Sequence, residues 1–194
     1  MFYHASNIGN LKTLKPHVSN HGKSLVYFSI KRENILVYLS NAVEKHIIEK
    51  HNRPLKQYEK WASYGITNDG RVRIEEYYPN ATKETFEGVS GYIYSVNNLD
   101  NPKPLRGIKD VFVVQDEVVV DGIEYVEDAY VEILKAEQEG KIVVERYEEI
   151  SDQKRQWIHD IILSEYEKSE NDDYKEFLLD KFVWLKSTID NKKD

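Results

Sequence analysis

Hydrophobic and polar residues form two kinds of pattern along this chain, and each predicts a type of secondary structure. Residues 1–6 make a short apolar and aromatic run, and residues 24–30 make a second run rich in β-forming side chains. Both runs have the length of a strand. The dipeptide Asp69–Gly70, between β-forming residues, indicates a hairpin turn. Between residues 31 and 51 apolar positions recur at spacings of three and four, which predicts a helix with the stripe Ile35, Leu36, Leu39, Ala42, Val43 and Ile47.

The middle of the chain is its most strand-like part. Residues 91–96 predict one strand, and residues 109–134 form a long β-rich tract that Gln115–Glu117 and Asp121–Gly122 interrupt. We interpret this tract as two strands followed by a segment that is either a further strand or the start of a helix. One more strand is expected around residues 142–147.

Two amphipathic helices are expected at the C-terminal end, over residues 151–169 and 172–190. Ser151, and Asp172 or Asp173, are suitable N-cap residues for them. Their apolar stripes are Trp157, Ile158, Ile161, Ile162 and Tyr166 in the first helix, and Phe177, Leu178, Phe182 and Leu185 in the second. The pair predicts a helical hairpin that either packs on the rest of the chain or offers a surface to a partner.

The order of these elements predicts an α+β fold with small split antiparallel sheets and a C-terminal helical hairpin. The 194 residues, of which 40% are hydrophobic and 31% charged, have the composition of a globular protein. We expect one domain in residues 1–150, with the hairpin of residues 151–194 packed on it. The 14 tyrosines favour strands and the walls of ligand sites.

Cysteine content and charge narrow the class of protein further. The chain has no cysteine, which excludes disulfides, thiolate metal sites and cysteine catalysis. No apolar run approaches the ~18 residues that span a bilayer, and the first residues lack a signal-peptide pattern. These observations predict a soluble cytoplasmic protein that does not bind a membrane. The net charge of −7 argues against a broad nucleic-acid surface.

The first strand contains a histidine. Strand residues alternate between two faces, so His4 and Ser6 lie on one face with Phe2, while Tyr3 and Ala5 lie on the other. The ordinary interpretation is a histidine at the edge of the core that hydrogen-bonds a backbone carbonyl. The alternative is that His4 and Ser6 belong to a binding site.

Several common active-site patterns are missing. His46 and His51 lie five residues apart on a predicted helix and so do not share one face, and HExxH is absent. The chain also lacks the GxSxG, GxGxxG and GxxxxGK[ST] patterns. We therefore expect no protein-bound metal, no serine nucleophile of that type and no glycine-rich phosphate loop.

Short motifs across residues 1–131 resemble the ADP-ribosyltransferase family. They are "FYHAS", "LKP", "LVYFS" and, after a helix, the later strand "DEVVV". The most similar branches carry a His-Tyr-Glu or His-Tyr-Asp triad, as in poly(ADP-ribose) polymerases and rifampicin ADP-ribosyltransferases. The triad positions match His4, Tyr27 and Glu117. The resemblance implies that NAD lies in a cleft between small sheets and serves as the substrate.

The resemblance also implies a role for each residue of the triad. His4 would donate to a hydroxyl of the adenosine ribose, and Tyr27 would stack on nicotinamide. Glu117 would bond the nicotinamide ribose and stabilise the cationic transition state as nicotinamide leaves. Asp116, one position away, is the alternative acidic residue.

Three small residues complete the cofactor contacts that the resemblance implies. They are Ala5, Ser6 and Ser29. The family usually has glycine after the histidine, whereas this chain has Ala5, which restricts the backbone more than glycine does.

Two functions therefore remain open. One is transfer of ADP-ribose from NAD to an unidentified protein, nucleic-acid or small-molecule acceptor. The other is a non-enzymatic module on the same fold that binds a nucleotide or a protein, with a homodimer as one form of interaction. Exposed side chains of Trp157 and Trp184 would indicate a contact surface, whereas buried ones would mean that the hairpin completes the core.

Overall fold

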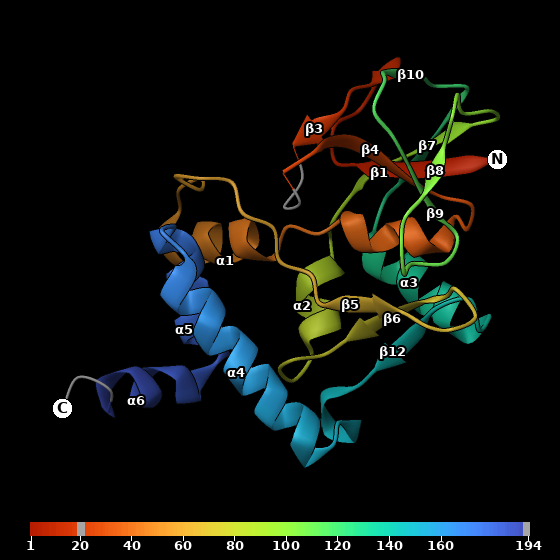
Figure 1. Cartoon of the computed structure of the whole chain (residues 1–194). Helices are drawn as coiled ribbons and strands as arrows, with labels where there is room; N and C mark the ends of the chain where they lie inside the picture. Colours follow the sequence, from red (N-terminus) through yellow and green to blue (C-terminus); the bar gives the residue numbers. More distant parts are fainter. Residues whose placement is uncertain (19–21, 192–194) are drawn as a thin grey trace. The chain divides into compact units, whose positions relative to one another are not determined.

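The structure is a computed structural model, and it describes residues 1–18 and 22–191. Residue contacts divide the chain into two compact units (Figure 1). Each unit is made of segments that are not adjacent in the sequence. Unit 1 comprises Met1–Ser40, Tyr64–Ile74 and Phe86–Val144. Unit 2 comprises Asn41–Ser63, Glu75–Thr85 and the residues from Glu145 on. The C-terminal helices thus share a unit with two earlier segments.

Unit 1 is built on a seven-stranded antiparallel sheet. The strand order is β11-β7-β1-β4-β9-β8, and β3 also pairs with β4. The bounds are Phe2–Ser6 for β1, His17–Val18 for β3, Ser24–Ser29 for β4, Gly91–Val96 for β7, Lys103–Pro104 for β8, Val111–Val114 for β9 and Gly122–Val126 for β11. The predicted strands at residues 1–6, 24–30 and 91–96 are confirmed. Tyr27 of β4 pairs in register with Val113 of β9.

The remaining strands form two smaller antiparallel sheets. One pairs β2 (Thr13–Leu14) with β10 (Val118–Val119), and the other has the order β12-β6-β5. The bounds in the second are Tyr64–Ile66 for β5, Val72–Glu75 for β6 and Val143–Glu145 for β12. The Asp69–Gly70 turn joins β5 to β6 as predicted. The α+β fold with antiparallel sheets and C-terminal helices is confirmed.

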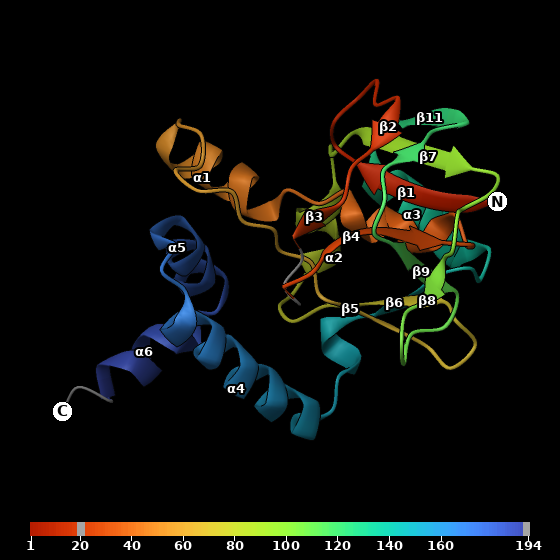
Figure 2. The same ribbon diagram turned by 45° about the horizontal axis from the view of Figure 1, so that its top comes forward.

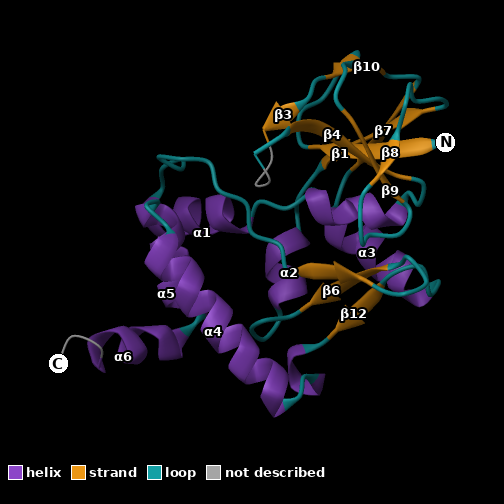
Figure 3. Cartoon of the chain, viewed as in Figure 1, coloured by secondary structure: helices purple, strands orange, loops and turns teal. Residues whose placement is uncertain are grey.

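The helix predicted over residues 31–51 is two helices. The 3-10 helix η1 covers Glu33–Tyr38, and α1 covers Ala42–His51. The backbone is not helical at Leu39 (φ −90°, ψ 59°) and Asn41 (φ −145°). Ser40 and Asn41 are of residue types that favour caps and turns over helix interiors. The apolar spacing continues across this break, and its residues Leu36, Leu39, Val43 and Ile47 are all fully buried. η1 packs on β1 and β4, and the helix α3 packs on η1 (Figure 3).

The segment after the β-rich tract is a strand followed by a helix. β11 is followed by α3, which covers Ala129–Gln138. Asp128 caps this helix, because its side chain accepts hydrogen bonds from the backbone N–H groups of Tyr130 and Val131. The two expected strands of the tract are β9 and β10, and the strand expected around residues 142–147 is the shorter β12.

Unit 2 contains three C-terminal helices where a hairpin of two was predicted (Figures 1 and 2). α4 covers Asp152–Lys168, α5 covers Asp172–Lys181 and α6 covers Val183–Asn191. The second predicted helix breaks at Phe182 (φ −114°, ψ 78°). Ser151 caps α4 as predicted, but Asn171 caps α5 in place of Asp172 or Asp173, because its side chain accepts from two backbone N–H groups of the first turn.

The core of unit 2 is aromatic and joins these helices to the earlier segments. Trp61 contacts Phe177 and Phe182 at ring-centroid distances of 5.6 and 5.8 Å, and Phe182 also meets Tyr78 at 5.5 Å. The short helix α2 (Ala81–Phe86) contributes Ala81 to the same cluster. Phe182, at the break between α5 and α6, is buried in this cluster, and residues of both helices pack into the same core.

The two tryptophans of the helices differ in burial. Trp184 is partly buried against the core, whereas Trp157 is 47% exposed. Within residues 1–18 and 22–191, no helix has both the length and the apolar character to cross a membrane.

Candidate functional site

A cavity of about 330 Å³ lies in unit 1 beside β4 and η1. Its walls come from four places in the sequence: β4, η1, the β5 strand and the loop before β9. Most of the lining is apolar or aromatic, with three tyrosines and one buried amide: Tyr27, Ile35, Tyr38, Tyr64, Ile66, Leu105, Ile108, Val111 and Asn34. Such a composition is typical of small-molecule sites.

The hydroxyl groups of the three tyrosines differ in their hydrogen bonding. The Tyr38 and Tyr64 rings meet edge to face, with centroids 5.8 Å apart, and their hydroxyls share a hydrogen bond. Burial raises the pKa of both phenols above the usual value, so both stay neutral. The Tyr27 hydroxyl is buried and has no hydrogen-bond partner within the described part of the chain. Leaving a buried hydroxyl unpaired costs about 1–3 kcal/mol, so a ligand group that pairs with Tyr27 gains affinity.

Asn34 connects the wall formed by η1 to the turn between β5 and β6. Its side chain is buried, donates to the Gly70 carbonyl at 2.8 Å and accepts from the Val72 N–H at 2.9 Å. Lys31 donates to the Asp69 carbonyl at 2.8 Å and pairs with the Asp110 carboxylate at 3.1 Å. These contacts join three separate segments around the cavity.

His4 lies next to Tyr27 but does not line the cavity. Its Nδ1 is 2.9 Å from the Tyr27 carbonyl oxygen. Since a carbonyl only accepts, Nδ1 carries the proton and Nε2 is the acceptor in the neutral ring. The ordinary interpretation of His4, a bond to a backbone carbonyl, is therefore confirmed. The same bond brings two members of the expected triad together.

The small residues of the expected site have different surroundings. Ala5 is buried in the core at 7% exposure. Ser6 accepts from the Ile8 N–H at 3.1 Å, which stabilises the turn after β1. Ser29 lines the cavity, and its hydroxyl oxygen accepts from the Lys31 N–H at 3.0 Å. Of these three, Ser29 alone is among the described residues of the cavity wall.

Glu117 lies away from the cavity wall. It occupies the bend between β9 and β10, its side chain is 57% exposed, and it pairs with Lys15 at 3.3 Å. Asp116 lines a second cavity, of about 740 Å³, that also includes Tyr27. The structure thus brings Asp116, rather than Glu117, into the lining of a space that Tyr27 shares.

Asp110 is a third acidic residue, and sequence reasoning missed it. It directly precedes β9, the strand paired with β4, and its side chain is only 18% exposed. Ile108 and Val111 on either side of it line the cavity. The signal was present in "KDVFVV", where an acidic residue opens a β-rich run, but the sequence does not reveal that this strand pairs with the strand of Tyr27.

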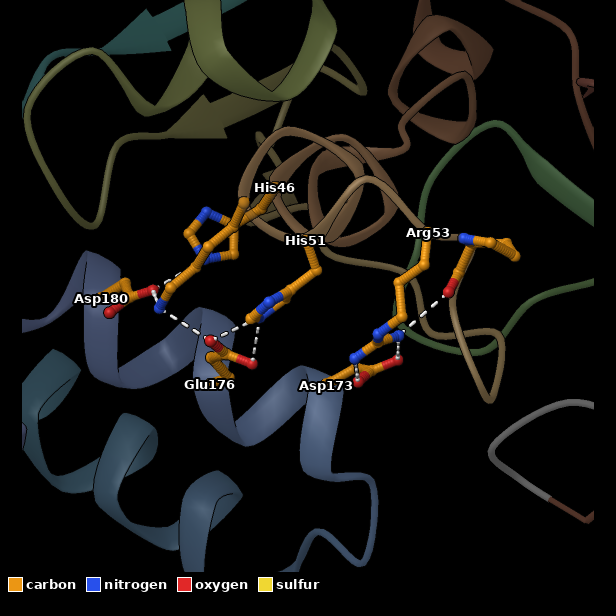
Figure 4. A network of polar contacts seen from close by, with 8 residues as sticks. His46, His51, Arg53, Asp173, Glu176 and Asp180 are labelled. Atoms are coloured by element: carbon orange, nitrogen blue, oxygen red, sulfur yellow. Dashed lines mark hydrogen bonds and ion pairs between the residues drawn. The ribbon is translucent and has the colours of Figure 1, made fainter.

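His46 and His51 take part in a polar network in unit 2, where α1 faces α5 (Figure 4). His46 contacts Asp180 at 2.9 Å and His51 contacts Glu176 at 2.8 Å, while Lys50 bridges both carboxylates. Each histidine thus pairs with a different carboxylate. Across the described residues, no three His, Asp or Glu side chains come together as metal ligands.

Comparison of the chain with models of protein families, with curated proteins and with solved structures finds no match.

Proposed function

We propose that unit 1 binds NAD in the cavity of Tyr27, Tyr38 and Tyr64, and that the protein transfers ADP-ribose from NAD to an acceptor. The observation that carries this proposal is the Tyr27 hydroxyl, which is buried without a partner among the described residues, in the wall of an aromatic cavity. Nicotinamide is a flat ring with a carboxamide. The ring suits aromatic walls, and the carboxamide offers an acceptor to the unpaired hydroxyl.

The position of His4 supports the same assignment. The bond from Nδ1 to the Tyr27 carbonyl fixes the orientation of the imidazole ring beside the strand of the cavity. In the proposed complex, His4 contacts a hydroxyl of the adenosine ribose, the role that the family resemblance implies.

Transfer breaks the bond between nicotinamide and C1′ of its ribose and forms a bond from C1′ to a nucleophilic atom of the acceptor, whose proton passes to water. Nicotinamide leaves with the bonding electrons, and the ribose becomes cationic in the transition state. A carboxylate close to the ring stabilises that charge. We assign this role to Asp110 because of its position beside the cavity, with Asp116 and Glu117 as the alternatives. We further propose that the reaction takes place in the cytoplasm.

The first test is calorimetric titration of NAD into the full chain. Tyr27→Phe keeps the ring and removes the hydroxyl, so we expect affinity to fall about two- to tenfold, the value of one neutral hydrogen bond. Tyr58→Phe is the matched control, because Tyr58 is 72% exposed and lies in unit 2. Absence of binding at millimolar NAD would overturn the proposal.

The acidic residue is tested by release of nicotinamide from NAD. We expect Asp110→Asn to abolish this release and Glu117→Gln to retain it. A loss confined to Glu117→Gln or to Asp116→Asn would assign the role to that residue instead. Circular dichroism controls for the loss of the ion pair between Asp110 and Lys31.

A further inference from the structure

The cavity of Tyr27, Tyr38 and Tyr64 is the smaller of two cavities in unit 1 that share part of their lining. Its volume of about 330 Å³ is at the lower end of the ~300–1,000 Å³ range of ligand pockets, which suits nicotinamide and its ribose. The larger cavity, of about 740 Å³, shares Tyr27 and Leu105 with it. The diphosphate and the adenosine of a bound NAD molecule must therefore lie outside the smaller cavity.

Strand pairing places Lys103 of β8 in one row with Tyr27 of β4. Val113 of β9 is the partner of both residues, because Tyr27 pairs with it from one side and Lys103 from the other. Residues directly opposite one another in antiparallel strands have their side chains on the same face of the sheet. Two strand spacings, about 10 Å in all, separate the backbones of Tyr27 and Lys103. Lys103 also lines the larger cavity.

The other charged residues of the larger cavity lie toward its opposite end. Asp116 comes after Val113 in the sequence and Asp100 comes before Lys103, which is the same direction along an antiparallel pair. Each is three residues from the row, a distance of about 10 Å along extended strands. Lys23, which precedes β4, lies toward the same end. The two carboxylates are thus separated from the row of Tyr27, where Lys103 is the cation.

The loop between β8 and β9 carries two further cations. Leu105 and Ile108 of this loop line the smaller cavity, and the Ile108 N–H donates to the Leu105 carbonyl at 3.1 Å. Arg106 and Lys109 each follow one of these lining residues, and both are exposed. The loop therefore directs apolar side chains to the cavity and presents positive charge beside it.

These three cations differ from many others in the chain because no carboxylate pairs with them. Among the residues that the structure describes, the side chains of Lys103, Arg106 and Lys109 form no ion pair or hydrogen bond. Lys31 and Lys154, in contrast, both pair with carboxylates. The chain as a whole has a net charge of −7, so positive charge concentrated at one loop favours an anionic ligand at that place.

We propose that Lys103, together with Arg106 and Lys109, binds the diphosphate of the dinucleotide whose nicotinamide lies beside Tyr27. This inference rests on the proposed function, because it takes NAD as the ligand of the smaller cavity. The ribose of the nicotinamide half spans the row from Tyr27 toward Lys103. Lys103 pairs with the diphosphate as a point charge, and Arg106 offers a planar fork of donors. The same groups hold ADP-ribose, which keeps the diphosphate after nicotinamide has left.

The test titrates two ligands into the full chain by calorimetry, NAD and ADP-ribose, of which the second lacks nicotinamide. Lys103→Gln removes the charge, so we expect both ligands to bind about three- to tenfold more weakly. Lys103→Arg, which keeps the charge, should retain the affinity for both. Arg106→Gln combined with Lys109→Gln should weaken both about two- to fivefold, since exposed charges contribute less. Tyr27→Phe should weaken NAD alone.

Lys135→Gln is the matched control. Lys135 is an exposed lysine of α3 in unit 1 that lines neither cavity, and its substitution should change neither affinity. An ADP-ribose affinity that Lys103→Gln leaves unchanged, or that Lys135→Gln lowers equally, would overturn the diphosphate site even where NAD binds. If NAD fails to bind while ADP-ribose binds and depends on Lys103, the proposed function is overturned and the diphosphate site is supported. Absence of binding of both ligands at millimolar concentration would overturn both.

Discussion

One glycine beside the Tyr27 cavity has a conformation and surroundings that exclude a side chain. Gly70, in the turn between β5 and β6, has φ +80°. A Cβ atom there would overlap the Asp110 carboxylate and come within 3.0 Å of Lys31 Nζ. The ion pair of Lys31 and Asp110 therefore occupies the space that any larger residue would need.

We expect Gly70→Ala to destabilise the protein more than Gly107→Ala. Gly107 has a similar φ of +79° but open space around it, so its substitution costs only the left-handed backbone conformation, about 1–2 kcal/mol. Gly70→Ala adds displacement of the ion pair. Urea unfolding of both variants measures the difference, and equal losses would show that Asp110 moves away without cost.

At the level of single residues, the sequence identified part of the candidate site. The motifs "YHAS" and "VYFS" select His4 and Tyr27, which a hydrogen bond joins in the structure. The cavity also depends on Tyr38 and Tyr64, whose proximity follows from the folding of distant segments. The choice of acidic residue depends on which strand pairs with β4, and residue patterns do not contain that information.

At the level of elements, charged side chains join α5 to α1 and to the segment that follows it (Figure 4). Arg53 binds Asp173 through two hydrogen bonds, of 3.0 and 2.6 Å. The same carboxylate also accepts from the Lys56 N–H at 2.8 Å. The Asp173 side chain is almost completely buried, at 2% exposure, so this ion pair is central to the start of α5.

This pairing predicts a pH dependence of stability. The Arg53 guanidinium, together with the Lys56 N–H, lowers the pKa of Asp173 to about 2. Because the pKa is lowered on folding, the ionised carboxylate stabilises the fold fully above the unfolded value near 4. That contribution is lost as the pH falls from about 4 to about 2.

Asp173→Asn keeps the shape of the side chain and removes its charge. We expect the variant to be less stable at neutral pH, and its free energy of unfolding to approach that of the unaltered chain as the pH falls toward 2. Asp172→Asn, at the exposed neighbouring position of α5, is the control. A constant difference across this range would contradict the assignment.

Element type was predictable from the sequence, but two helix breaks were not. The apolar stripe of residues 31–51 continues through Leu39, and that of residues 172–190 continues through Phe182. Both residues are buried, at 0% and 2% exposure, so the burial pattern persists where the hydrogen bonding stops. Hydrophobic spacing reports which side chains are buried, and it does not report whether the backbone between them stays helical.

At the level of the whole molecule, the chain leaves unit 1 and returns to it twice before the C-terminal helices begin. Composition indicated a boundary near Ser151, where helices replace strands. The core of unit 2, however, combines those helices with Trp61, Tyr78 and the start of α1. Segments that share a core without being adjacent in sequence leave no local signal of their association.

Removal of the residues after 150 tests this organisation. The shortened chain retains all seven strands of the large sheet but loses Phe177 and Phe182, which contact Trp61 and Tyr78. We expect amide exchange to stay slow in β1, β4 and β7 and to become fast in Asn41–Ser63, with Trp61 fluorescence shifted toward that of a solvated indole. The exposed aromatic side chains should also promote aggregation. Slow exchange throughout Asn41–Ser63 would contradict a shared core and support residues 1–150 as a domain that folds alone.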